Sequence, residues 1–118
     1  MPVTTFREAL RQGITEEMQN DEKVIMIGED IGLYQGCFKV TEGMLDKFGP
    51  ERILDTPLSE AAITGCGVGV ALAGYRPIVE IMFADFLTLA MDHLVNSASK
   101  MRYMHDGEIE LPFVLRAP

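Results

Sequence analysis

The stretch RILDTPLSEAAITGCGVGVALAGYRPIVEIM, residues 52–82, contains a strand, a helix and a second strand in that order. Short apolar runs at 52–55 and 78–82 predict the two strands. Small and apolar residues between them predict a helix that runs to Gly74 and is capped by Ser59 or Thr56. This alternation is typical of a parallel sheet that carries its helices on its faces.

The same alternation continues on both sides of this stretch. A capping box at Thr5 and Glu8 opens an amphipathic helix, and Asp106-Gly107 predicts a turn. The remaining expected elements are a helix over 5–19, a strand over 24–28, a loop over 29–38, a short helix from Thr41 to Phe48, a helix over 86–104 and a strand over 112–116. The sequence therefore predicts an α/β domain, a parallel sheet with helices on both faces.

Composition narrows the class of partner. The chain has 118 residues, which favours one domain, and a formal net charge of −8, which argues against nucleic acid and anionic membranes. The longest apolar run, Ile63 to Tyr75, is short and rich in glycine, and the first residues do not read as a signal peptide. These features predict a soluble cytoplasmic protein. A hydrophobic content of 47% predicts apolar surface reserved for a partner.

Several motifs are weaker than they look. Residues 65–70, GCGVGV, depart from the dinucleotide fingerprint, because the third glycine is misplaced and the run lies inside a helix. Close helix packing is the simpler interpretation. Cys37 and Cys66 form no CxxC pair and are expected to be free thiols. His93 and His105 have no ligands at metal spacing, so no metal site is predicted.

Acidic residues follow two of the predicted strands. Glu29 and Asp30 come after the first strand and Glu60 after the second, where open parallel sheets bind their ligands. A solvated loop is the alternative for Glu29 and Asp30. For Glu60, apolar neighbours would favour the neutral carboxyl, whereas the start of a helix favours the charged carboxylate. A simple partner of the helix dipole is therefore the alternative for Glu60.

Five segments together resemble one family. They are GEDIG at 28–32, KFG at 47–49, DTPLSE at 55–60, FADF at 83–86 and NSASKMRY at 96–103. In order and over the whole chain, they resemble the beta subunit of thiamine-diphosphate-dependent 2-oxo acid dehydrogenases. That family includes the pyruvate, branched-chain and acetoin dehydrogenases.

The resemblance implies a pyrimidine-binding domain and assigns roles to four residues. Glu60 would hydrogen-bond N1′ of the cofactor's aminopyrimidine and promote the tautomer that removes the thiazolium C2 proton. Phe86 would pack on the pyrimidine ring, with Leu58 beside it, and Glu29 would lie near the cofactor. Ordinary core residues are the alternative for Phe86 and Leu58.

The resemblance also implies partners. The family's alpha subunit holds the diphosphate and its magnesium within a heterotetramer, and the complex has an acyltransferase core. Family chains are much longer, so residues 1–118 are expected to be the N-terminal part of the domain, inactive alone and able to self-associate. Two alternatives stay open, a non-catalytic module that pairs with an alpha subunit or itself, and a transketolase-like enzyme such as a deoxyxylulose phosphate synthase. The substrate is not determined.

Overall fold

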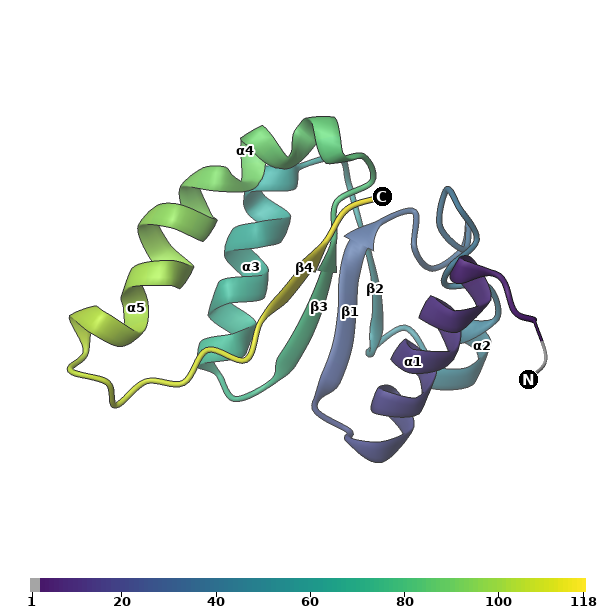
Figure 1. Ribbon diagram of the computed structural model, residues 1–118, viewed down its shortest axis with the longest axis horizontal. Coiled ribbons are helices and arrows are strands. Elements are labelled where there is room, and N and C mark those ends of the chain that lie inside the picture. Colours follow the sequence, from purple (N-terminus) through teal and green to yellow (C-terminus); the bar gives the residue numbers. More distant parts are fainter. Residues whose placement is uncertain (1–2) are drawn as a thin grey trace.

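A four-stranded parallel sheet organises residues 3–118, the part of the chain that the computed structural model describes (Figure 1). The strands are β1 (Val24–Glu29), β2 (Ile53–Thr56), β3 (Arg76–Glu80) and β4 (Val114–Arg116), in the order β2-β1-β3-β4. Each neighbouring pair is parallel. The predicted class is confirmed, and the predicted strands are present with ends shifted by one or two residues.

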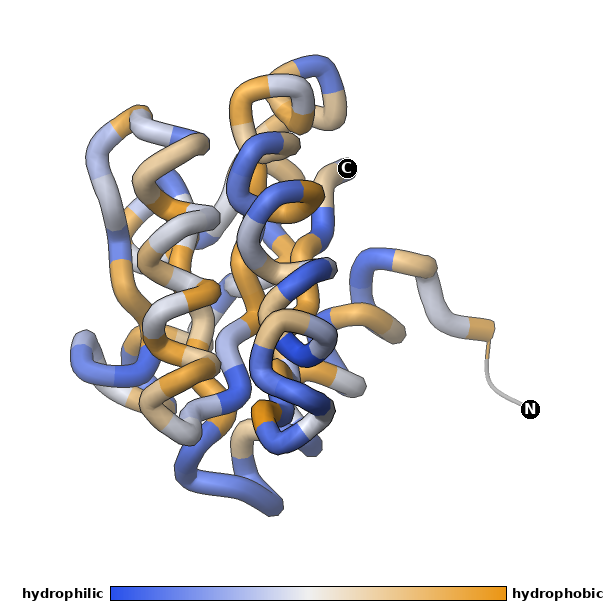
Figure 2. The backbone as a smooth tube through the Cα atoms, turned by 90° about the vertical axis from the view of Figure 1, so that its left-hand side faces the viewer, coloured by the Kyte–Doolittle hydropathy of each residue, from blue (hydrophilic) through white to orange (hydrophobic). Residues whose placement is uncertain are grey.

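Helices cover both faces of the sheet. Helices α1 (Phe6–Asn20) and α2 (Met44–Phe48) lie on one face; α3 (Glu60–Leu72), η1 (Ala84–Phe86), α4 (Leu87–Asp92), η2 (His93–Ala98) and α5 (Ser99–Met104) lie on the other (Figure 1). All six residues of β1 are buried, because its side chains alternate between the two cores. Figure 2 shows hydrophobic segments in the middle of the molecule and hydrophilic turns at its lower end.

Helix α1 is fixed at both ends. The predicted capping box is present: Glu8 N donates to Thr5 Oγ1 at 3.2 Å, and Thr5 N donates to the Glu8 carboxylate at 3.0 Å. At the other end, the guanidinium of Arg52 donates to the carbonyls of Met18, Asp21 and Val24. One side chain from the start of β2 therefore ties the end of α1 to β1. No helix in the described part of the chain is long and apolar enough to cross a membrane.

Two predicted helices differ from the observed ones. The prediction that Thr41 caps the short helix is wrong: α2 starts after Gly43, while the buried Thr41 hydroxyl donates to the Ile31 carbonyl at 2.6 Å. The helix predicted over 86–104 begins with a 3₁₀ turn at Ala84 and contains a π-helical segment, η2. A π turn inserts an extra residue into the helix, which a 3.6-residue period does not reveal.

The glycines of α3 allow close packing, as predicted. A Cβ added at Gly67 would lie 2.4 Å from Val79 Cγ2 and 2.7 Å from Phe113 Cε2, while one at Gly65 would lie 2.9 Å from His93 Cε1. Gly69 on the same helix has no atom within 4 Å of an added Cβ. Helix α3 thus approaches β3 more closely than a helix of larger residues could.

The two glycines give a matched pair of substitutions. Gly67→Ala should lower the free energy of unfolding by about 1–3 kcal/mol, because the methyl group overpacks the contact with Val79. Gly69→Ala should raise it by about 0.5–1 kcal/mol, because alanine favours the helix and meets open space. Urea unfolding followed by circular dichroism measures both. Equal effects of the two substitutions would contradict the close approach of α3 to β3.

Candidate functional site

The carboxyl edge of the sheet gathers the residues that the sequence singles out. Glu29 ends β1 and pairs in register with Thr56, which ends β2. The segment after β2 carries Leu58 and then Glu60, the first residue of α3. Phe86 lies in η1, which follows β3. The parallel topology therefore delivers all four predicted site residues to one edge of the sheet.

Glu29 is the buried carboxyl group of this edge. Its exposed fraction is only 3%, and its Oε1 accepts a hydrogen bond from the Ser59 amide at 3.2 Å. Burial raises the pKa of Glu29, and the negative charges of Glu60 and Asp30 raise it further, whereas the Ser59 hydrogen bond opposes the shift. A solvated-loop interpretation of Glu29 is wrong, because the side chain is buried and accepts the Ser59 amide.

Glu60 has a different environment from the one expected. It is half-buried, and the closely packed glycines of α3, Gly65 and Gly67, lie further along the helix, against His93 and β3. Ser59 occupies the N-cap position, but its hydroxyl donates to the Pro57 carbonyl and makes no cap hydrogen bond. Glu60 is therefore more exposed to solvent than Glu29, its acidic neighbour at the carboxyl edge.

Exposed apolar side chains lie on the segments that form this edge. Leu58 is 76% exposed and Phe86 is 42% exposed, so neither is a core residue in this chain. Phe83 contacts both Phe38 and Phe86 edge to face, with ring centroids 6.2 Å apart in each pair. Sequence reasoning missed Phe38 and Phe83, because only the fold brings the loop after β1 next to the turn after β3.

Two buried polar atoms at this edge have no partner among the described residues. They are Glu29 Oε2 and Thr56 Oγ1, at the ends of neighbouring strands. An unpaired buried polar atom is costly, and such atoms occur where a ligand completes the hydrogen bonding. Residues 3–118 contain no cluster of three His, Cys, Asp or Glu side chains that could hold a metal ion. Glu29 Oε2 and Thr56 Oγ1 can instead form hydrogen bonds with a polar organic group.

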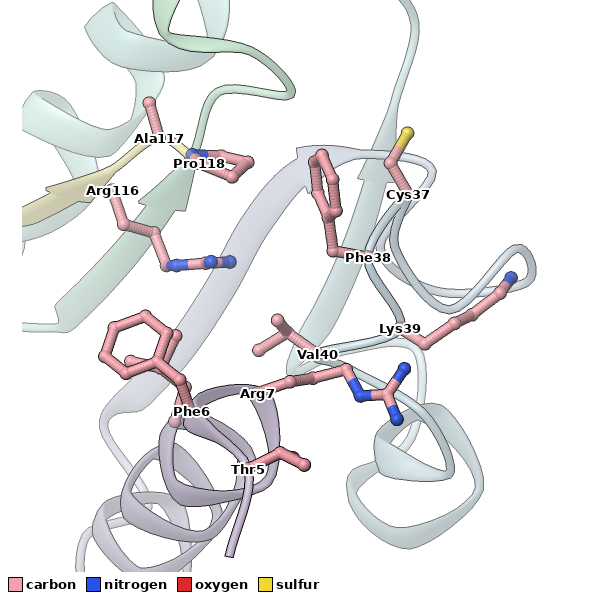
Figure 3. Close-up of a pocket in the computed structure, with 11 residues that line it drawn as sticks. Thr5, Phe6, Arg7, Cys37, Phe38, Lys39, Val40, Arg116, Ala117 and Pro118 are labelled. Atoms are coloured by element: carbon pink, nitrogen blue, oxygen red, sulfur yellow. The ribbon is translucent and has the colours of Figure 1, made fainter.

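A separate cavity lies between α1 and the last residues of the chain. It has a volume of about 700 Å³ and is lined by the first turn of α1, residues 37–40 and the chain from Arg116 to Pro118 (Figure 3). Arg116 pairs with the buried Glu80. Burial raises the pKa of Glu80, and Arg116 opposes that shift. None of the four predicted site residues lines this cavity.

A parallel sheet with acidic and aromatic side chains at the carboxyl ends of its strands is typical of a ligand-binding α/β domain. Comparison with known proteins identifies the family of this domain. Residues 3–118 match the family model for the pyrimidine-binding domain of transketolase, so the chain belongs to that family.

Its relatives are more specific. The chain is 52% identical over 114 residues to "Pyruvate dehydrogenase E1 component subunit beta-1, mitochondrial" of Arabidopsis thaliana, covering 97% of this chain and 31% of that protein. It is also 52% identical to the "Pyruvate dehydrogenase E1 component subunit beta" of Rickettsia bellii, covering 97% of this chain and 35% of the relative. The chain thus spans about a third of the length of these relatives.

A solved structure shares the fold. The chain superposes on a structure titled "Split gene transketolase, inactive beta4 tetramer" with a TM-score of 0.60 and 21% sequence identity. The match covers 94% of this chain and 33% of that one. At this identity the likeness supports the fold alone.

The burial of Glu29 predicts a pH-dependent stability. A carboxyl group whose pKa is raised by folding makes the fold less stable as the pH rises from the ordinary value of 4.5 through the raised value. Glu29→Gln keeps an acceptor for the Ser59 amide and does not titrate. The free energy of unfolding of this variant, relative to the unsubstituted chain, should therefore increase between pH 4.5 and neutral pH.

Urea unfolding over this pH range measures the difference. Glu110→Gln removes one exposed carboxylate of the same type and serves as the control, with a difference that varies little with pH. A Glu29→Gln difference as flat as that of the control would show that Glu29 is not desolvated.

Proposed function

We propose that this chain forms the pyrimidine-binding part of the beta subunit in the thiamine-diphosphate-dependent decarboxylating component of a 2-oxo acid dehydrogenase complex. The observation that carries the proposal is the acidic pair Glu29 and Glu60 at the carboxyl edge, with Glu29 Oε2 buried and unpartnered among the described residues. The similarity to pyruvate dehydrogenase subunits favours pyruvate among the candidate substrates. These relatives include mitochondrial and bacterial proteins, so a cytoplasmic location stays a prediction.

The residues present fit the aminopyrimidine half of thiamine diphosphate. An aminopyrimidine is flat, with apolar faces and a polar edge. Leu58 and Phe86 offer exposed apolar surface for the faces, and the Glu60 carboxyl group can meet a ring nitrogen. Glu29 Oε2 and Thr56 Oγ1 supply further unpaired polar atoms. Each requirement of the ring thus has a matching group at this edge.

The same residues do not fit the diphosphate half. Two adjacent carboxylates repel phosphate groups, and the described residues contain no cluster that could hold magnesium. The alpha subunit of the family is therefore our proposed source of the diphosphate and magnesium site. The complete active site would lie between this edge and that subunit.

Thiamine diphosphate, when bound, would supply a thiazolium carbon that adds to the 2-oxo group and a cationic ring that takes up the electron pair left by departing carbon dioxide. The chain's own contribution is proton control at the opposite ring. Glu60 holds a proton at N1′ of the aminopyrimidine, as general acid–base catalysis requires. Glu29, whose pKa is raised, remains neutral more readily than an exposed acid and so limits charge repulsion beside Glu60. Leu58 and Phe86 exclude water from the ring.

The proposal includes partners beyond the chain. An alpha subunit completes the site within a heterotetramer, and the acyltransferase core of the complex accepts the product. Exposed Leu58, Phe83 and Phe86 offer apolar surface for that subunit or, in its absence, for a second copy of this chain. The isolated chain is expected to be inactive. A non-catalytic pairing module is less favoured, because it would have no use for a buried, destabilising carboxyl group.

Glu60→Gln tests the proposal in the full-length subunit assembled with its partner. Glutamine keeps the volume and one hydrogen bond but does not exchange a proton with N1′. The rate of C2 proton exchange on the bound cofactor should fall roughly 100-fold or more, the scale for losing a proton-transfer group. Glu110→Gln, with an exposed carboxylate outside the site, should retain the full rate.

A melting curve of each variant accompanies the rate measurement. If Glu60 serves only the helix dipole, Glu60→Gln should cost less than about 1 kcal/mol of stability and keep its rate. That result would remove Glu60 from the mechanism and contradict the proposed function.

A further inference from the structure

We propose that Asp55 is a positioning residue, which holds the loop after β1 and thereby fixes Glu29 relative to Glu60. The inference rests on the proposed function, since it assigns Asp55 a part in setting up that acidic pair. Asp55 belongs to β2 and lies in register with Gly28, one residue before Glu29. In this role the Asp55 side chain contacts no reacting group. It acts through its hydrogen bonds to the backbone of the loop after β1.

The Asp55 carboxylate holds two consecutive amides of that loop. Oδ1 accepts a hydrogen bond from Gly32 N at 2.5 Å, and Oδ2 accepts one from Leu33 N at 2.9 Å. A Cβ at position 32 would lie 2.6 Å from Asp55 Oδ2, so this close approach needs glycine. Charge-assisted hydrogen bonds of this kind are stronger than neutral ones and fix both partners in space.

Glu29 makes the corresponding contact, from β1 to the segment that follows β2. Glu29, at the end of β1, accepts the amide of Ser59 from the segment after β2. Asp55, in β2, accepts amides from the segment after β1. Each of the two strands therefore supplies one carboxyl group, which accepts amide hydrogen bonds from the segment that follows the other strand. Glu29 and Glu60 lie within this arrangement, because Glu60 directly follows Ser59.

The loop held by Asp55 has an unfavourable backbone conformation. Asp30 has a φ of 55°, in the left-handed region that residues other than glycine rarely adopt, although aspartate and asparagine do so more often than the others. The flanking residue Ile31 is fully buried, and its carbonyl accepts the Thr41 hydroxyl at 2.6 Å. Such a conformation persists where its surroundings hold it. Asp55 holds the following part of the loop by accepting hydrogen bonds from the amides of Gly32 and Leu33.

Loss of the Asp55 contacts removes two hydrogen bonds that hold the loop after β1 to β2, while the Ser59 amide still binds the Glu29 carboxyl group. The loop can then shift, and the Glu29 side chain next to it can change its orientation relative to Glu60, while the Glu29 backbone stays paired with Thr56 in the sheet. A displacement of about 1 Å in a catalytic arrangement can cost on the order of 100-fold in rate. Asp55 thus controls the geometry of the acidic pair from outside it.

The test uses the full-length subunit assembled with its partner, with thiamine diphosphate and pyruvate as the probes. Asp55→Asn keeps the shape but turns an amide NH₂ toward one of the two backbone donors. Gly32→Ala leaves the carboxylate in place and pushes the contact apart from the other side. Asp106→Asn is the control, since Asp106 is an exposed residue in a distant turn with a φ of 54° that asparagine accepts.

Asp55→Asn and Gly32→Ala should each lower kcat by about 10- to 100-fold, with a KM for pyruvate within a few-fold of the unsubstituted protein. Hydrogen exchange of residues 30–36 should become faster in both variants, while α1 and β1 exchange as before. The double variant should be little worse than either single variant, because both break one contact. Asp106→Asn should match the unsubstituted protein throughout.

Glu60→Gln in the same preparation separates the two levels of the proposal. If Glu60→Gln is inactive while Asp55→Asn and Gly32→Ala keep their kcat, the positioning role is overturned and the proposed function stands. Unchanged exchange at 30–36, or additive losses in the double variant, would also overturn it. If Glu60→Gln keeps the full rate, the proposed function fails and the positioning role fails with it. If Asp55→Asn does not assemble, Gly32→Ala decides the question by the same readouts.

Discussion

The burial of the Glu29 carboxyl group at the end of β1 is the constraint on which the rest of the site depends. A carboxylate removed from water is destabilising unless it is neutralised or hydrogen-bonded. Here burial and the neighbouring acids raise the pKa of Glu29, and one backbone amide partly compensates the loss of water. The second oxygen has no partner among the described residues. The fold therefore maintains a polar group whose hydrogen bonding the described chain leaves incomplete.

That burial follows from the packing of the sheet. Strand β1 lies between β2 and β3 with a core on each face, so its last residue is covered along with the others. Glycines in α3 let the helix pack closely against β3 and His93. Glu60 begins that helix and comes to lie beside Glu29. The position of the acidic pair is thus a consequence of strand order and helix packing.

The fold was largely predictable because its signals are local. The capping box of α1, the apolar run of β1 and the glycines of α3 each depend on residues close in sequence. The errors arise where distant residues compete: the Thr41 hydroxyl bonds to Ile31 and leaves α2 to start after Gly43. The sequence also did not predict the π-helical segment η2, because apolar periodicity does not reveal one inserted residue.

Sequence reasoning proposed the residues of the candidate site but did not predict their environment. Motif resemblance selected Glu29, Leu58, Glu60 and Phe86, and the topology brings them to one edge. The sequence suggested that Glu60 is the desolvated acid, whereas the more buried acid is Glu29. Burial depends on the order of the strands, which no local pattern gives. Phe83 and Asp55 lie in motifs that carry the resemblance but were given no role, because the contacts of Phe83 with Phe38 and of Asp55 with Gly32 join segments distant in sequence.

The most direct test is hydrogen exchange of the full-length assembled complex with and without thiamine diphosphate and magnesium. The central claim is that the carboxyl edge of this sheet forms half of the cofactor site. Exchange should slow in residues 29–36, 56–62 and 83–87, which form that edge, and should stay unchanged in residues 21–24, which lie at the opposite edge. Cofactor binding that leaves all three carboxyl-edge segments unprotected would contradict the account.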